Sequence, residues 1–212
     1  MTIKAKNELV RFARLLHQHG YTAALDGNLS VRLSDGRLLA TRSGCHKGLM
    51  TSDDVLLLDE SGKKLQGDGE PTSEIAMHLA CYAARDAVRA VIHAHPPHAI
   101  AATLVGVSLQ APILPEAVIA LGAVPTLPYE RTGTTDLADS VEGAIWGHPA
   151  VMLERHGSVT VGTSLLDAFC NLESLEHTAK ILLLAHGVRQ PDELPAAEVE
   201  ALQRIGAVRR LL

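Results

Sequence analysis

A short apolar run that ends in two histidines limits most strongly how this chain can fold. Residues 88–94 are almost entirely apolar, and the run ends in His93-Ala94-His95. A run of this length and composition is typical of a buried β-strand. Because side chains alternate between the two faces of a strand, His93 and His95 are expected on the same face. The sequence therefore predicts a central strand with two imidazoles side by side at its end.

The segments around this strand predict helices and strands in mixed order. Further strands are expected over residues 29–33, 37–41, 55–59, 64–66, 151–153 and 158–161. Helices are expected over residues 5–19, 71–85, 98–105, 135–146, 165–186 and 193–210. Residues 106–131, rich in proline and glycine, give no clear prediction. The order predicts a single α/β domain over residues 1–212, with a central, largely antiparallel β-sheet covered by helices.

The composition supports one well-packed domain and argues against several classes of protein. With 47% hydrophobic and 20% charged residues, the chain can bury a full core. A net charge of −5 and scattered basic residues argue against nucleic-acid binding. No run reaches the roughly 18 apolar residues of a membrane span. The three cysteines, Cys45, Cys81 and Cys170, are odd in number and widely spaced, which is not the pattern of a disulfide framework. We expect a cytoplasmic protein that binds neither nucleic acid nor a membrane.

Glu74 and His156 are candidates to complete a metal site with the two histidines. Glu74 begins the helix before the central strand, so the returning chain can bring it near the strand's end. His156 lies between two predicted strands and precedes a glycine, which permits a sharp turn. One carboxylate and three imidazoles suit a divalent transition metal, zinc above all.

Each of these residues also has an ordinary structural interpretation. Glu74 could cap its helix, and His156 could be a turn histidine that bonds to the backbone. His78 follows Glu74 by one helical turn, so it could be a rival ligand or a partner of one. The chain has turned away after Pro96-Pro97, so His98 is not expected at the site.

Three loops of small and polar residues form a second group of candidates. They are Asp26-Gly27-Asn28-Leu29-Ser30, Arg42-Ser43-Gly44 and Pro71-Thr72-Ser73. Such loops expose backbone N–H groups that can bind a phosphate. Thr72 and Ser73 also begin a helix, whose N-terminus favours an anion. Each loop alone could be an ordinary turn, and Arg42 and Lys47 could either add positive charge or be solvated.

The whole pattern resembles the class II aldolase/adducin family, and most closely the L-fuculose-1-phosphate aldolase type. The likeness runs from about residue 5 to about residue 190. It is carried by Gly27-Asn28-Leu29-Ser30-Val31-Arg32, Ser43-Gly44, Pro71-Thr72-Ser73-Glu74, His93-Ala94-His95 and Arg155-His156-Gly157. The resemblance implies a three-layer fold and a homotetramer with active sites at subunit interfaces.

The resemblance also implies a role for each motif. Zinc, or another divalent transition metal, would be held by Glu74, His93, His95 and His156, with Glu74 also the catalytic acid and base. The phosphate of a sugar substrate would be bound by Gly27, Asn28, Ser43, Gly44, Thr72 and Ser73.

The implied reaction is cleavage of a ketose 1-phosphate, similar to fuculose 1-phosphate, to dihydroxyacetone phosphate and a short aldehyde. A metal ion would stabilise the enediolate as a Lewis acid. Sugar-phosphate dehydratases, epimerases and decarboxylases of the same superfamily remain alternatives, as does a non-catalytic adducin-like interaction module. Some fuculose-phosphate enzymes use a tyrosine where this chain reads Ile113-Leu114-Pro115-Glu116. The proton donor to the aldehyde product is therefore left open.

Overall fold

The apolar run predicted as a central strand is strand β5, Ala90–Ala94, and it lies inside an eight-stranded sheet. The computed structural model describes residues 2–211, and the strand order is β4-β3-β2-β1-β5-β8-β7-β6. β5 pairs antiparallel with β1, Asn28–Arg32, on one side and with β8, Gly157–Gly162, on the other. Only β6 and β7 pair in parallel. The predicted α/β domain with a largely antiparallel sheet is confirmed.

The remaining strands extend the sheet on both sides of this centre. They are β2 Leu38–Thr41, β3 Val55–Leu58, β4 Lys64–Gln66, β6 Thr126–Leu127 and β7 Ala150–Leu153. The helices are α1 Thr2–Gln18, α2 Ile75–Ala84, α3 Pro97–Val105, α4 Pro115–Ala120, α5 Thr135–Ile145, α6 Leu165–His186 and α7 Ala196–Leu211. Two single-turn 3₁₀ helices, η1 Lys47–Leu49 and η2 Ser52–Asp54, lie between β2 and β3.

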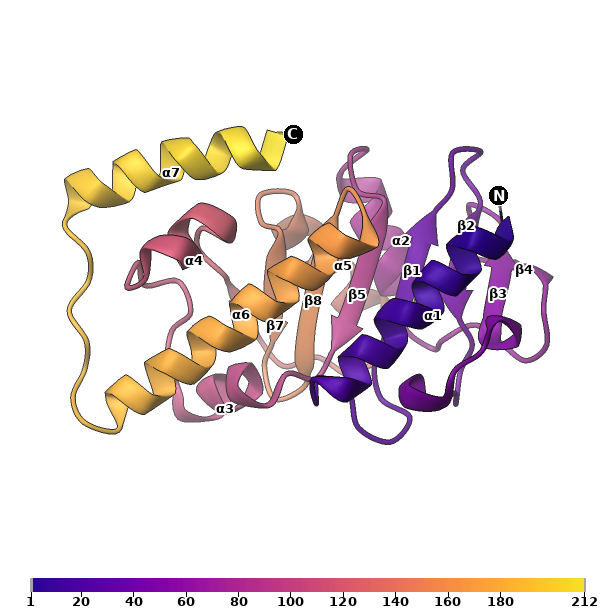
Figure 1. Cartoon of the computed structure of the whole chain (residues 1–212), viewed down its shortest axis with the longest axis horizontal. Helices are drawn as coiled ribbons and strands as arrows, with labels where there is room; N and C mark the ends of the chain where they lie inside the picture. Colours follow the sequence, from indigo (N-terminus) through magenta and orange to yellow (C-terminus); the bar gives the residue numbers. More distant parts are fainter. Residues whose placement is uncertain (1, 212) are drawn as a thin grey trace.

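Helices cover both faces of the sheet and give three layers (Figure 1). On one face, Phe12 of α1 and Phe169 of α6 pack against Ile92 of β5. On the other face, Met77 of α2 belongs to the same cluster as Val91 of β5. Because neighbouring strand residues face opposite sides, β5 needs apolar side chains throughout. Burying one such side chain contributes roughly 1.5–3 kcal/mol, so the two cores fix β5 firmly.

A third apolar cluster lies beside β7, at the end of the sheet away from α1. It joins Ala99 of α3, Leu121 after α4, Met152 of β7 and Leu182 of α6. Helix α7 lies along α4 on the outside of this region (Figure 1). Along residues 2–211, no helix combines the length and hydropathy that crossing a membrane requires.

Residues 106–131, which gave no clear prediction, contain α4 and β6. Pro115 stands in the first turn of α4, where its missing N–H costs nothing and its fixed φ suits a helix. Strand β6 has two residues, and its register is set by the parallel partner β7. A strand of this length depends on its neighbour rather than on its own sequence. The sequence therefore shows no periodic pattern that predicts it.

Candidate metal centre and anion pocket

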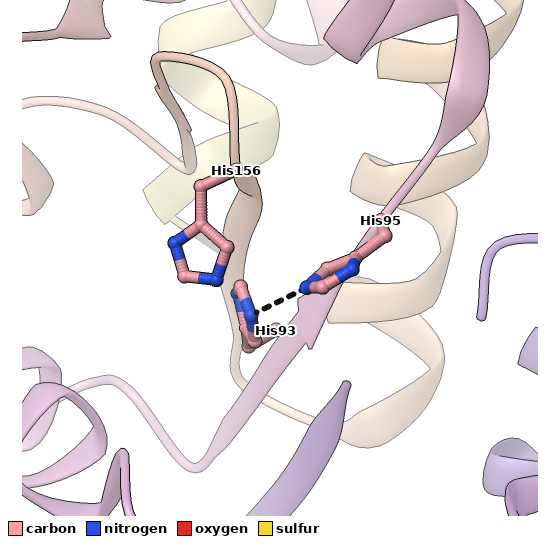
Figure 2. A group of neighbouring side chains, drawn as sticks. All are labelled: His93, His95 and His156. Atoms are coloured by element: carbon pink, nitrogen blue, oxygen red, sulfur yellow. Dashed lines mark hydrogen bonds between the residues drawn. The ribbon is translucent and has the colours of Figure 1, made fainter. Parts of the chain in front are cut away.

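Three histidine rings converge where β5 meets the turn between β7 and β8. His93 lies within β5, His95 follows the strand, and His156 lies in the turn (Figure 2). The Nε2 atoms of His93 and His95 are 3.1 Å apart. One ring nitrogen of each histidine lies within 4.8 Å of the others. The structure thus brings together the three histidines that the sequence singled out.

Glu74 faces the same point from the start of α2. Its Oε2 atom lies 3.3 Å from His93 Nε2, and its Oε1 atom lies 3.4 Å from His156 Nε2. Glu74 is the residue just before the helix, yet its side chain makes no capping hydrogen bond. Oε1 is buried and accepts no hydrogen bond among the described residues. A buried carboxylate oxygen without a donor is well suited to a cation.

The electrostatics of the rings favour metal binding over protonation. Burial lowers the pKa of His93 well below its ordinary value and also lowers the pKa of His95 and of His156. The Nδ1 atom of His93 lies 3.0 Å from the carbonyl oxygen of Ser158, which can only accept, so Nδ1 carries the proton. The Nε2 lone pair of His93 is therefore free to face a cation.

The turn that carries His156 approaches β5 closely because its next residue is a glycine. A Cβ atom at Gly157 would lie 2.5 Å from the Ala94 carbonyl oxygen and 2.8 Å from His95 Cδ2. Arg155 has a φ of 59°, a left-handed conformation that costs roughly 1–3 kcal/mol outside glycine. The strained turn and the glycine together direct His156 at the other two rings.

Three neutral imidazoles and one carboxylate form a donor set of the kind that divalent transition metals prefer. An ion fits among the unbonded Oε1 atom of Glu74 and the facing Nε2 atoms of His93 and His95. The three-histidine group can therefore hold a metal ion.

A pocket of about 230 Å³ opens beside the histidines. All six residues predicted to bind phosphate line it, namely Gly27, Asn28, Ser43, Gly44, Thr72 and Ser73. Glu74, His95 and His156 line it too, while His93 is fully buried behind them. Three loops far apart in sequence thus meet one metal-binding group. Thr132, in the small polar loop before α5, also lines the pocket and was missed, although its loop has the same composition.

Lys47 is a buried cation in the wall of this pocket. It is only 2% exposed, and its Nζ atom donates to the carbonyl oxygens of Leu25 and Cys45, each at 2.9 Å. Among the described side chains no carboxylate forms an ion pair with it, and burial lowers the pKa of Lys47. Asp26 and Glu74 lie near enough to act on its charge, but neither pairs with it directly, so the buried ammonium favours an anion in the adjoining pocket. The sequence had left open whether Lys47 was solvated.

The other histidines have partners of their own. His78 is fully buried, and its ring bonds to Asn28 and Ser30, so it is not a rival ligand in this structure. His98 bonds to Glu176 at 2.6 Å, away from the site, as expected.

Comparison with known proteins finds relatives along nearly the whole chain. The chain is 34% identical to the 3-oxo-tetronate 4-phosphate decarboxylase of Haemophilus influenzae, over 97% of this chain and 100% of the relative. It superposes on YgbL from Escherichia coli, whose reaction is named only as aldolase, epimerase or decarboxylase. The TM-score is 0.89 at 32% identity, covering 95% of this chain and 99% of that one.

A solved L-fuculose 1-phosphate aldolase gives a TM-score of 0.87 at 32% identity, covering 94% of each chain. The resemblance read from the sequence is confirmed, but the decarboxylases represent a reaction that the sequence offered as an alternative. Residues 7–183 match the Class II Aldolase and Adducin N-terminal domain. The chain belongs to the class II aldolase and adducin family and is an enzyme of the lyase class.

Proposed function

We propose that this protein is a metal-dependent decarboxylase that converts a 3-oxo-tetronate 4-phosphate to dihydroxyacetone phosphate and CO₂. One observation carries the proposal: a single pocket joins the glutamate and histidine group to a buried, unpaired ammonium and three polar loops. Such a pocket suits a short substrate with a phosphate at one end and a carbonyl oxygen near the metal ligands. The similarity to decarboxylases of that substrate class along nearly the whole chain supports this choice.

In this proposal Glu74, His93, His95 and His156 hold a divalent metal ion, with zinc the first candidate. When bound, the ion supplies Lewis-acid stabilisation of negative charge on the substrate's oxygens. The converging ring nitrogens and the unbonded Glu74 Oε1 atom support the assignment.

The polar loops bind the phosphate at the other end of the pocket. Hydroxyl groups of Ser43, Thr72 and Ser73 and backbone N–H groups at Gly27 and Gly44 supply donors. Holding the phosphate fixes the position of the reacting carbons. Binding energy from the phosphate end therefore orients the substrate for the reaction. Lys47 supplies the charge, as its burial in the pocket wall suggests.

The chemical step needs little from the protein beyond orientation and one proton. The bond between C1 and C2 breaks, C1 leaves as CO₂, and the bonding electrons form an enediolate across C2 and C3. Glu74 then delivers to C2 one proton taken up from solvent, which completes dihydroxyacetone phosphate. Glu74 is suitably placed because it lies between the histidines and the pocket.

Aldol cleavage of a ketose 1-phosphate is the second candidate, and it would form the same enediolate. The similarity to the fuculose-phosphate aldolase structure supports it. Aldol cleavage also needs a base for the hydroxyl on the leaving carbon, whereas a carboxylate is already ionised. Among residues 2–211, none of the three tyrosines, Tyr21, Tyr82 and Tyr129, lines the pocket of this chain. Because decarboxylation needs no base for a hydroxyl group, it is the favoured reaction.

A panel of substrates tests the proposal. It contains 3-oxo-tetronate 4-phosphate, L-fuculose 1-phosphate, ribulose 5-phosphate and methylthioribulose phosphate, with CO₂ and dihydroxyacetone phosphate both measured. We expect equal amounts of the two products from the 3-oxo acid, well above its spontaneous decay. Dihydroxyacetone phosphate and an aldehyde from the ketose 1-phosphate alone would instead establish the aldolase. Equal turnover of an unphosphorylated acid would contradict the phosphate site.

Replacing Lys47 with methionine is expected to raise KM for the phosphorylated substrate by roughly 10- to 100-fold, because a charge-assisted contact contributes about 1.5–3 kcal/mol. The kcat value should change little, and inorganic phosphate should inhibit the variant more weakly. Lys47→Arg should retain most of the affinity, and Lys63→Met, at an exposed lysine, is the matched control. An unchanged KM in a folded Lys47→Met variant would remove this lysine from the site.

We further propose a cytoplasmic homotetramer with active sites at subunit interfaces. Large apolar side chains on the surface, such as Trp146 at 74% and Tyr129 at 62% exposure, support association. Leu25, on the rim of the pocket, is also exposed. The unpaired cysteines are consistent with a reducing setting. Light scattering should give four times the chain mass of 22.6 kDa. A fully active monomer would contradict the tetramer.

A further inference from the structure

A continuous row of buried polar side chains leads from Glu74 into the layer between the sheet and α2. Asn28 and Ser30 are two residues apart on β1, so both face α2. His78 and Tyr82 are four residues apart on α2, so both face β1. The two pairs interleave in an interior that is otherwise apolar, where each polar group needs a partner.

Four hydrogen bonds connect the row. Asn28 Nδ2 donates to Glu74 Oε2 at 2.9 Å, and Asn28 Oδ1 lies 2.5 Å from His78 Nε2. His78 Nδ1 lies 2.7 Å from Ser30 Oγ, which lies 2.7 Å from the Tyr82 hydroxyl. The four residues beyond Glu74 are each at most 5% exposed. Both ends of the Asn28 carboxamide are therefore engaged within the protein.

Only one direction of donation satisfies every group in the row. Among the described residues, Ser30 is the one hydrogen-bond partner of the buried Tyr82 hydroxyl, so Tyr82 is satisfied as a donor only if it donates to Ser30, and Ser30 in turn donates to His78 Nδ1. His78 is then protonated on Nε2 and donates to Asn28 Oδ1. That bond leaves the Asn28 amide nitrogen facing Glu74. Burial lowers the pKa of His78 to about 3, so the ring stays neutral with a single N–H.

We propose that Tyr82, Ser30 and His78 act as positioning residues that fix the orientation of the Asn28 carboxamide and, through it, of Glu74. Asn28 holds Oε2 and leaves the unbonded Oε1 turned toward His156. The opposite tautomer of His78 would flip the carboxamide and set two acceptor oxygens against each other. This inference rests on the proposed metal-binding role of Glu74, and it gives Asn28 a task separate from phosphate binding.

The experiment compares Ser30→Ala and Asn28→Asp with Thr160→Val. Thr160 is a matched control because its buried hydroxyl bonds to the Ala168 carbonyl on the other face of the sheet. The first readout is the tautomer of His78 in metal-free protein, from long-range ¹H–¹⁵N NMR. The second is the affinity for Zn²⁺ by chelator competition, without substrate.

We expect wild-type His78 to carry its proton on Nε2 and Ser30→Ala to show a mixture of tautomers. Outer partners of metal ligands typically contribute about 10- to 100-fold in affinity, so Zn²⁺ binding should weaken about tenfold in Ser30→Ala and more in Asn28→Asp. The Zn²⁺ affinity of Thr160→Val should stay within about twofold of wild type, because the Thr160 hydroxyl does not contact a metal ligand. If Ser30→Ala does not fold, the Zn²⁺ affinity of Asn28→Asp tests the inference.

Wild-type His78 protonated on Nδ1, or unchanged Zn²⁺ affinity in both site variants, would overturn the inference. These outcomes are separate from failure of the proposed function. That failure would appear as tight Zn²⁺ binding without turnover of any substrate in the panel, and the tautomer and affinity measurements would be unaffected.

Discussion

Glu74→Gln is expected to abolish turnover and leave the fold intact. Glutamine keeps the size of the side chain and can still accept from Asn28. It cannot carry the proton to C2, and general acid–base groups typically contribute about 10²- to 10⁴-fold. We therefore expect kcat with 3-oxo-tetronate 4-phosphate, at saturating metal, to fall by about 10²- to 10⁴-fold, with an unchanged melting temperature.

Glu60→Gln, at an exposed site, is the matched control and should behave as wild type. Turnover by Glu74→Gln within tenfold of wild type would show that another group delivers the proton.

His95→Ala is expected to remove both the metal and the activity. The substitution takes away one of the three converging nitrogens, and a transition-metal site with a missing ligand loses most of its affinity. Metal analysis of protein purified without chelator should give about one ion per chain for wild type and far less for the variant. Activity should fall with the metal content.

His148→Ala provides the contrast. His148 lies just before β7, and its Nδ1 atom bonds to the Ala123 carbonyl, with no role in the pocket. This variant should keep both metal and turnover. A fully active metal-free wild type, or a His95→Ala variant with normal metal content, would contradict the proposed centre.

The main parts of the site could be predicted because they follow from short-range rules. The period of two in a strand placed His93 and His95 on one face, and the glycine after His156 indicated a sharp turn. Small polar residues at element ends marked the loops that form the pocket. These signals lie in residues that are neighbours in the sequence, so they can be recognised without knowledge of the tertiary structure.

The rest depends on contacts that the sequence does not encode locally. Burial of Lys47 arises because two backbone carbonyls from separate loops meet its ammonium group. The bond from Asn28 to Glu74 depends on side-chain rotamers on two different elements. Likewise, β6 exists only as a partner of β7.

The choice of reaction is hard to predict for a chemical reason. Decarboxylation of a 3-oxo acid phosphate and aldol cleavage of a ketose 1-phosphate both pass through the enediolate of dihydroxyacetone phosphate. In the proposed function, the metal-binding residues and the phosphate-binding loops serve that shared half of the substrate. Only the group that departs differs, so in this proposal the choice of reaction depends on the residues that contact that group. Motifs that bind the shared half of the substrate therefore indicate the superfamily but do not distinguish between the two reactions.

The most direct test of the central claim is anomalous diffraction at the zinc edge, from crystals of Zn²⁺-loaded protein soaked with dihydroxyacetone phosphate. We expect one strong peak about 2.0–2.2 Å from ring nitrogens of His93, His95 and His156. We also expect phosphate density between Ser43, Ser73 and Lys47 in the same pocket. Zinc bound elsewhere, or a phosphate outside this pocket, would contradict the claim.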